Sequence, residues 1–272
     1  MTYSILINTC DKFEDCWDPF FKLWSLYWPD CKGKVYLNTE YKDYSYSGVN
    51  ITAVKGCEGK RIKGKFATWS QCLRWALERI DTDIVLYMQE DYFLNGPVDN
   101  ATLEHYVKWL ERHKDVSCIH LTPYGIPADT SYGEEHLFYG QKSFFSYLSC
   151  QAALWHRKDL LALIRDGETA WNFEWWGSRR AQYGGFAFLT FPKEWLQKKQ
   201  IMPYLCTGVI GGRWFPPVVE LFKKHNISID FSKRGFYNSK ETKTINQRIK
   251  TKWSIYCRWR SILEVLRLKY KI

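Results

Sequence analysis

The segment from Ile84 to Leu94, IVLYMQEDYFL, constrains the fold most, because a continuous apolar run ends abruptly in polar residues. Its first four residues, Ile84 to Tyr87, are typical of a strand that is covered on both faces. Glu90 and Asp91 would be costly inside such a strand, so we expect them at its end, facing a ligand or a metal ion. The alternative is a solvated junction between a strand and a loop.

The length and the cysteine content limit the class of protein. A chain of 272 residues is long enough for one large α/β domain with an appendage. Its nine cysteines form no CxxC pair and show no Cys and His spacing typical of a zinc site, so we predict reduced, cytosolic thiols. Residues 1–10 do not resemble a signal peptide, and no stretch of eighteen residues is apolar throughout, so we expect neither secretion nor a spanning helix.

The positive charge is concentrated at the C-terminus. Of the net charge of +10, residues 240–272 carry +8, from ten Lys or Arg and two Glu. The other 239 residues therefore carry only +2. A body so close to neutral is not expected to bind nucleic acid across its surface.

The first half of the chain alternates strand and helix patterns, which is typical of a sheet with helices packed on it. Apolar runs predict strands at residues 3–8, 35–37, 49–54, 84–88 and 116–121. Periodic apolar residues predict helices at residues 17–28, 67–80 and, with Asn100 or Thr102 as the cap, to about residue 110. The second half is less regular, with shorter helices predicted at 158–164 and 218–224.

The order of these segments resembles a known family. One strand ends in Asn8-Thr9-Cys10-Asp11, the next ends in Asn38-Thr39-Glu40, and a basic loop and a helix then precede the acidic strand end. This order resembles the nucleotide-sugar-binding half of GT-A glycosyltransferases, particularly bacterial enzymes of capsule and O-antigen assembly. The resemblance covers roughly residues 3–215. It implies a Rossmann-like mixed sheet flanked by helices.

The resemblance also implies a role for the acidic strand end. In that family an Asp-x-Asp motif at this position binds a divalent ion and the diphosphate of the donor. Here the triplet is Gln89-Glu90-Asp91, so Asp91 matches the metal-binding carboxylate, and Glu90 matches either a metal ligand or a contact to the sugar. The cofactor implied is Mn²⁺ or Mg²⁺. Because Gln89 is a weak ligand, a metal-free site remains open, with cations from the loop that contains Lys60, Arg61, Lys63 and Lys65.

The resemblance implies further contacts to the donor and the acceptor. Those expected at the nucleotide-sugar are Asn8, Thr9, Cys10, Asp11, Glu40, Lys65, Trp69, Gln89 and Glu90. For each of Asn8, Thr9, Cys10, Asp11 and Glu40 alone, the alternative is a role in capping a helix or turn. For the lysine-rich loop that contains Lys65, the alternative is a solvated turn. Aromatic residues stack on pyranose rings, so the acceptor residues expected are Trp171, Trp175, Trp176, Arg179 and Trp214.

Glu174 is the expected catalytic base of an inverting transfer. It lies in the segment TAWNFEWWGSRR, at residues 169–180, between Phe173 and Trp175. Partial desolvation among aromatic rings raises the pKa of a carboxyl group toward the range that a general base requires. The alternative is a structural carboxylate paired with Arg179 or Arg180.

The C-terminal segment has the pattern of a basic amphipathic helix. Apolar residues such as Ile245, Ile249 and Trp253 recur at helical spacing, with Lys and Arg around them. This pattern is typical of a helix that lies in an anionic membrane interface. A helix packed on its own domain and an RNA-binding tail are the alternatives. We therefore divide the chain into a GT-A-like domain at 1–239 and a membrane-association region at 240–272.

Together these expectations describe a glycosyltransferase of surface polysaccharide synthesis. It would move a sugar from a nucleotide-sugar donor, with UDP-sugar favoured, to a lipid-linked saccharide. It would be cytoplasmic and peripheral on the inner face of the plasma membrane. The competing interpretation is a non-catalytic, membrane-peripheral protein that binds nucleotides or carbohydrates through a degenerate site.

Overall fold

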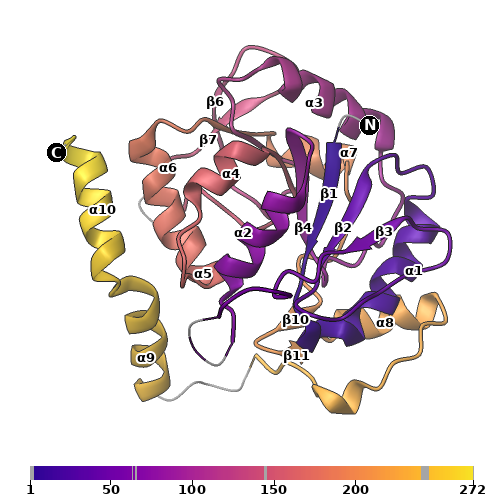
Figure 1. Cartoon of the computed structure of the whole chain (residues 1–272). Coiled ribbons are helices and arrows are strands. Elements are labelled where there is room, and N and C mark those ends of the chain that lie inside the picture. The colour runs from indigo at the N-terminus through magenta and orange to yellow at the C-terminus, as the bar shows by residue number, and fades with distance from the viewer. Residues whose placement is uncertain (1–2, 63, 65, 144–145, 240–244, 272) are drawn as a thin grey trace.

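A nine-stranded sheet forms the centre of the molecule (Figure 1). The computed structural model describes residues 3–62, 64, 66–143, 146–239 and 245–271. The strands are β1 Tyr3–Asn8, β2 Lys34–Asn38, β3 Ile51–Ala53, β4 Ile84–Gln89, β5 Cys118–His120, β6 Ala128–Ser131, β7 Phe138–Gly140, β8 Ala153–His156 and β9 Phe188–Thr190. Their order across the sheet is β3-β2-β1-β4-β8-β5-β9-β7-β6. The predicted α/β class, with a mixed sheet flanked by helices, is confirmed.

The interior strands β8 and β7 each run antiparallel to both of their neighbours. Strands β3, β2, β1 and β4 are parallel, whereas β8 pairs antiparallel with both β4 and β5. Ala153, the first residue of β8, lies opposite Tyr87 and His120, near the carboxyl ends of those two strands. The chain just before β8 therefore enters the edge of the sheet at which β1 and β4 end.

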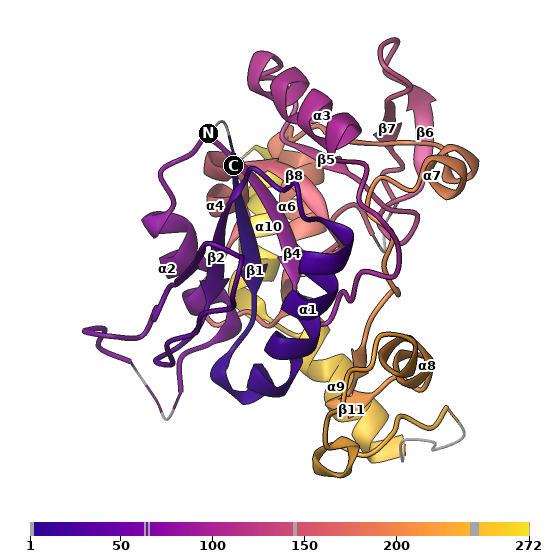
Figure 2. The same ribbon diagram turned by 90° about the vertical axis from the view of Figure 1, so that its right-hand side faces the viewer.

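Two layers of helices cover the sheet (Figures 1 and 2). One face packs against α1 (Trp17–Tyr27) and α3 (Asn100–Arg112), and the other against α2 (Trp69–Arg79) and α4 (Arg157–Leu163). Successive strand residues point to opposite faces, so Ile5 and Ile7 belong to the first core while Leu6 belongs to the second. This double burial explains the continuous apolar runs of β1 and β4.

The remaining elements are short, apart from the two terminal helices. They are the 3₁₀ helices η1 Asp11–Cys16 and η3 Phe231–Lys233, the helices α5 Ala170–Asn172, α6 Ser178–Gly184, α7 Lys193–Lys199 and α8 Pro217–Lys224, the π-helical turn η2 Phe173–Gly177, the hairpin strands β10 Val209–Ile210 and β11 Arg213–Trp214, and the terminal helices α9 Ile245–Tyr256 and α10 Trp259–Tyr270.

Local signals fix the ends of the longer helices. Thr68 and Gln71 form a capping box at the start of α2, which fixes the helix next to the basic loop. The predicted cap of α3 was wrong. Asp99, and neither Asn100 nor Thr102, is the N-cap, because its carboxylate accepts hydrogen bonds from both the Thr102 amide at 3.0 Å and the Thr102 hydroxyl at 2.9 Å.

Helices α9 and α10 form an outer layer beside α5 and α6 (Figure 1, yellow). The inward face of α10 buries Ser261 and Val265, and Glu264 forms ion pairs with Arg165 at 2.6 Å and Arg180 at 3.7 Å. The outward face carries most of the large apolar side chains, which are exposed: Ile245, Ile249, Trp253, Trp259, Ile262, Leu263, Leu266 and Tyr270. No helix in the described part of the chain is both long and apolar enough to cross a bilayer.

Candidate active site

A cavity of about 460 Å³ opens at the edge of the sheet where β1 and β4 end. Its lining comes from the ends of β1 and β4 and from residues 150–151, 170–174 and 206–212. The sequence-predicted residues that line it are Asn8, Thr9, Cys10, Trp69, Gln89, Glu90, Asp91, Trp171 and Glu174. The fold thus brings together side chains from four separate parts of the sequence.

Asp91 is held by the chain that crosses the cavity. Its Oδ2 accepts three hydrogen bonds, from Thr207 Oγ1 at 2.6 Å, Gly208 N at 3.1 Å and Val209 N at 3.0 Å. A side chain on Gly208 would lie 2.8 Å from the Asp91 carbonyl oxygen and against the Phe93 ring, so glycine is required there. Burial raises the pKa of Asp91, and the three donors act in the opposite direction. One carboxylate oxygen of Asp91 therefore anchors the loop at residues 207–209.

Glu90 is buried and lacks such partners. Its side chain is 7% exposed, and no side chain in the described part of the molecule donates a hydrogen bond to it. Burial raises its pKa well above the usual range, the neighbouring Asp91 adds to this, and the charge of Arg234 opposes it. Such a carboxylate is costly to ionise unless a cation neutralises it.

These two carboxylates fit a divalent metal ion. Mg²⁺ and Mn²⁺ prefer oxygen ligands, and Glu90 and Asp91 are adjacent carboxylates on one wall of the cavity. Among the described residues that line the cavity there is no Lys or Arg. Glu90 and Asp91 can thus supply oxygen ligands to a divalent ion. Lys63 and Lys65, two of the cations of the metal-free alternative, lie outside the described residues.

Glu174 lines the same cavity. It lies in the π-helical turn η2, and π-helical turns are frequent at functional sites because they displace a side chain from the regular helical path. Its Oε1 accepts hydrogen bonds from Cys150 N at 2.7 Å and Ser149 Oγ at 3.5 Å, both just before β8. Burial raises its pKa, and these hydrogen bonds act in the opposite direction.

Of the two arginines in this segment, Arg180 is paired with a carboxylate other than Glu174. Arg180 forms a bidentate pair with Glu168, at 2.9 and 2.7 Å, and both side chains are buried. The Arg179 guanidinium stacks on the Trp175 ring at 3.6 Å and donates to the Trp175 carbonyl. Arg180 is therefore not the ion-pair partner of Glu174 that the alternative interpretation of Glu174 as a structural carboxylate expects.

Asn8, Thr9 and Gln89, at the ends of β1 and β4, are held by a polar network. Asn8 accepts a hydrogen bond from Asn38 at 2.8 Å and donates to the Tyr87 hydroxyl at 3.3 Å, to which Gln89 also donates. The Thr9 hydroxyl accepts from the Trp17 indole at 2.9 Å. This network fixes the strand ends and leaves the cavity wall polar.

Asp11 and Glu40 join the loops after β1 and β2. The Asp11 carboxylate accepts from the backbone amides of Glu40, Tyr41 and Lys42, and the Asp11 amide donates to Glu40 Oε2 at 3.2 Å. Neither residue is among those that line the cavity. Lys65, expected at the nucleotide, lies outside the described residues.

The structure places most of the expected acceptor residues elsewhere. Trp175 packs on Tyr256 with ring centroids 4.2 Å apart, and the Trp176 indole donates to the Ile255 carbonyl at 2.8 Å, so both contact α9. Trp214 is fully buried in the first core. Only Trp171, which is 69% exposed, reaches the cavity.

Three residues that line the cavity were not predicted from the sequence. Gln151, Cys206 and Thr207 line it without any motif in their surroundings. The signal for Gln151 was present, since a polar residue interrupts the apolar run before β8. The segment at 206–212 gave none, because only its contact with Asp91 makes it part of the site.

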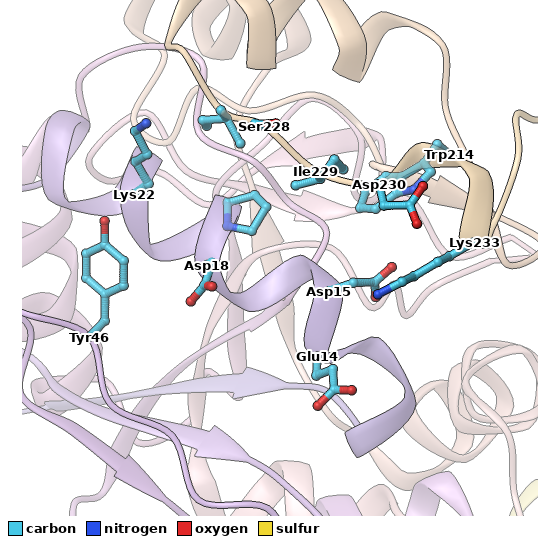
Figure 3. Close-up of a pocket in the computed structure, with 12 residues that line it drawn as sticks. Glu14, Asp15, Asp18, Lys22, Tyr46, Trp214, Ser228, Ile229, Asp230 and Lys233 are labelled. Atoms are coloured by element: carbon cyan, nitrogen blue, oxygen red, sulfur yellow. The ribbon is translucent and has the colours of Figure 1, made fainter.

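A second cavity of about 510 Å³ lies beside α1 and β11 (Figure 3). Glu14, Asp15 and Asp18 project into it from the helical segment that follows β1, opposite Asp230 and Lys233. It contains mixed charges, but none of the strand-end carboxylates. The first cavity is therefore the candidate active site.

No family model matches the chain, and no curated protein matches it. Part of the fold is similar to solved structures at low identity. TarS residues 1–349 from S. aureus is 10% identical, with a TM-score of 0.43, over 71% of this chain and 60% of that one. Mannosyltransferase PcManGT from Pyrobaculum calidifontis, with GDP-Man and Mn²⁺, is 15% identical, with a TM-score of 0.45, over 70% and 55%. Glucosyl-3-phosphoglycerate synthase from Mycobacterium tuberculosis, with Mn²⁺ and UDP-glucose, is 10% identical, with a TM-score of 0.45, over 88% and 80%. At this level of similarity the function depends on the evidence of the site itself.

Proposed function

We propose that the protein is a GT-A-like glycosyltransferase that moves a sugar from a nucleotide-sugar, with a UDP-sugar favoured, to a saccharide acceptor. The observation that carries the proposal is the convergence of Glu90, Asp91 and Glu174 on one cavity at the carboxyl edge of the sheet. Ligands of open α/β sheets bind at this edge. A cavity with two adjacent carboxylates and a third from a distant part of the chain suits a donor whose leaving group needs a cation and an acceptor that needs a base.

Glu90 and Asp91 act on the nucleotide-sugar donor. Glu90 and the Oδ1 atom of Asp91 would hold Mn²⁺ or Mg²⁺, and the bound ion supplies neutralising charge for the nucleoside diphosphate that departs. The residues after β1, including Asn8 and Cys10, and the aromatic ring of Trp69 line the remaining donor side. Glu40, which lies outside the cavity wall, would act through its hydrogen bonds with Asp11.

Glu174 has the role of general base for an inverting transfer. Its carboxylate takes the proton from the acceptor hydroxyl as that oxygen forms a bond to the anomeric carbon. The bond from the anomeric carbon to the diphosphate breaks, and the nucleoside diphosphate leaves with the electron pair. Cys150 N and Ser149 Oγ orient the carboxylate, and Trp171 provides an exposed ring on the acceptor side.

We also infer that the acceptor is lipid-linked, as in bacterial surface polysaccharide synthesis, and that the enzyme works at the inner face of the plasma membrane. The support is the outward face of α9 and α10, where exposed apolar side chains are interspersed with Lys and Arg. Such a face suits an anionic bilayer interface.

A panel of UDP-, GDP- and CMP-sugars tests the activity through donor binding and slow donor hydrolysis, each with and without Mn²⁺. We expect one donor to be hydrolysed, with the metal required.

Glu174→Gln should lower turnover by about 10²–10⁴-fold, while the dissociation constant for the donor changes little. Because the pKa of Glu174 is raised, the acid limb of the wild-type rate profile should lie above the usual range of a glutamate, and activity should rise with pH through that limb.

Glu220→Gln is the matched control, since Glu220 is exposed on α8 and is not among the residues that line the cavity. Its turnover should equal that of the wild type. Donor binding without any hydrolysis or transfer would instead identify a non-catalytic binding protein. Full turnover in Glu174→Gln would remove Glu174 from the role of base.

A further inference from the structure

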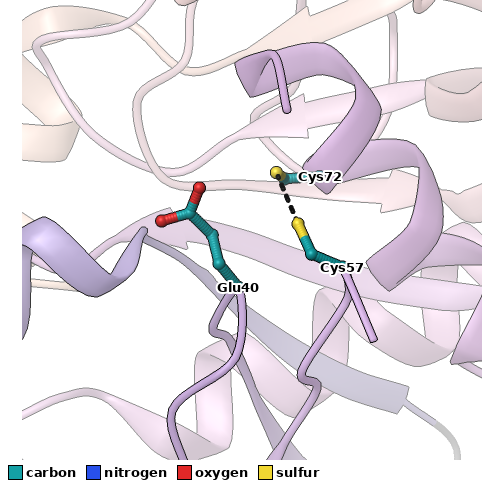
Figure 4. A group of neighbouring side chains, drawn as sticks. All are labelled: Glu40, Cys57 and Cys72. Atoms are coloured by element: carbon teal, nitrogen blue, oxygen red, sulfur yellow. Dashed lines mark hydrogen bonds between the residues drawn. The ribbon is translucent and has the colours of Figure 1, made fainter. Parts of the chain in front are cut away.

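A second group of metal-ligating side chains lies outside the candidate active site (Figure 4). Glu40 follows β2, Cys57 follows β3, and Cys72 is in α2. The ligand atoms of these three residues lie within 4.8 Å of one another, and the two sulfur atoms are 4.0 Å apart. The three residues, named here the thiol cluster, come from three different elements.

The backbone holds the thiol cluster in place. Cys57 N donates to the Glu40 carbonyl at 3.0 Å, so two of the three residues are directly linked. Glu40 Oε2 accepts from Asp11 N, which limits the orientation of its carboxylate. Cys72 lies in the first turn of α2, behind the Thr68 and Gln71 capping box. Positions fixed in this way lower the entropic cost of binding an ion.

The ligand set suits a thiophilic ion. A tetrahedral Zn²⁺ with sulfur ligands at about 2.3 Å places two sulfur atoms roughly 3.8 Å apart, close to the 4.0 Å between Cys57 and Cys72. A carboxylate is a common third ligand, and three protein ligands leave one position for water. Two thiolates also favour Zn²⁺ over Mg²⁺ or Mn²⁺, which prefer oxygen ligands.

We propose that Glu40, Cys57 and Cys72 form a binding site for a thiophilic divalent ion, with Zn²⁺ as the fitting chemical class. This site is distinct from the oxygen site at Glu90 and Asp91 and goes beyond the proposed transfer activity. It joins the loops after β2 and β3 to the start of α2, whose first residue, Trp69, lines the active-site cavity. A bound ion would therefore brace the wall of the donor side.

Anaerobic titration of the full chain with Co²⁺ and Zn²⁺, after reduction with a phosphine, tests the proposal. We expect one equivalent of Co²⁺ to produce a thiolate-to-cobalt charge-transfer band, which Zn²⁺ then removes, and Zn²⁺ to raise Tm. Cys57→Ser and Cys72→Ser should each abolish the band. Glu40→Gln should weaken binding by at least about tenfold, as expected for loss of one ligand. Cys257→Ser, at an exposed cysteine, should behave like the wild type.

Absence of a charge-transfer band, or a band that persists in both Cys57→Ser and Cys72→Ser, would overturn the proposal. So would a loss of two hydrogens by mass with no bound ion, which would indicate a disulfide. The Zn²⁺-dependent rise in Tm of the wild type does not depend on whether the variants fold. The Co²⁺ titration reports on the thiol cluster, whereas the donor assay reports on the site at Glu90 and Asp91. A negative titration therefore does not contradict the proposed transfer activity. A negative donor assay likewise does not contradict the thiol cluster as an ion site.

Discussion

Glu90 is the residue at which stability and function oppose each other. It is buried, and burial favours its neutral form, so its folded pKa lies above its unfolded value. Between these two pKa values the folded state binds more protons than the unfolded state, so the free energy of unfolding falls as pH rises. The charge that would suit a metal ion therefore destabilises the ion-free protein.

Glu90→Gln should stabilise the ion-free protein at pH 8, because the amide carries no charge to desolvate. Tm should rise by about 2–4 °C for each kcal/mol gained. The gain should shrink as pH falls through the raised folded pKa, where the wild-type side chain takes up its proton. Thermal unfolding at pH 5 and pH 8 with a chelator present measures this, with Glu220→Gln as the control. A wild type that is more stable than Glu90→Gln at pH 8 would contradict the expectation.

The chemical identity of single residues was predictable, but their partners were not. The apolar run before Glu90 and Asp91 indicated a strand end, and aromatic neighbours indicated the setting of Glu174. In contrast, the donors to Asp91 come from residues 207–209, more than a hundred positions away, and no local pattern identifies them. The same applies to the thiol cluster, whose cysteines have no metal-site spacing.

At the scale of elements, the turn that carries Glu174 is tied to α9. Asn172 donates to the Ser254 carbonyl at 3.0 Å, and the Trp176 indole donates to that of Ile255 at 2.8 Å. These two residues stand on either side of Glu174 in the chain. Helix α9 thus supports the π-helical turn from outside the sheet, which explains why Trp175 and Trp176 do not line the cavity.

Trp176→Phe should loosen this support, because phenylalanine keeps most of the packing but cannot donate the hydrogen bond. We expect faster amide hydrogen exchange in α9 and a lower kcat, with donor binding unchanged. Trp253→Phe is the matched control, since the Trp253 side chain is 68% exposed on the same helix. Unchanged exchange in α9 would show that the hydrogen bond does not hold the helix.

Long periodic elements were predicted well and short ones poorly. Strands β1 and β4 and helices α1 and α2 match within about two residues, because double burial and helical periodicity both leave clear patterns. Strands β6, β7 and β9 and helix α7 were not predicted. β6 is Ala-Asp-Thr-Ser and largely exposed, so its pairing with β7 has no hydrophobic signal.

For the whole molecule, the question is what covers the outer face of α9 and α10. The packing and membrane interpretations of this segment are compatible, because the inward face contacts α6 while the apolar side chains point outward. The division of the chain at residue 239 stays a prediction.

The membrane interpretation predicts binding to vesicles that contain anionic lipid and weak binding to neutral ones, with affinity that falls as salt increases. Replacing Trp253 and Trp259 with serine should weaken binding by about tenfold or more, since two interfacial aromatic side chains are lost. Leu26→Ser is the control, because Leu26 is 53% exposed on α1. Co-sedimentation with vesicles measures the binding of the wild type, of the double variant and of Leu26→Ser. Equal binding to neutral and anionic vesicles, or no effect of the double change, would count against this face.

The proposed membrane association through the outward apolar face also changes which concentration of the acceptor sets the reaction rate. A molecule held on a bilayer by α9 and α10 encounters a lipid-linked acceptor by diffusion in two dimensions. Its rate is then governed by the number of acceptors per unit of membrane area. Diluting the acceptor with inert lipid would slow the reaction although the amount of acceptor in the sample stays the same.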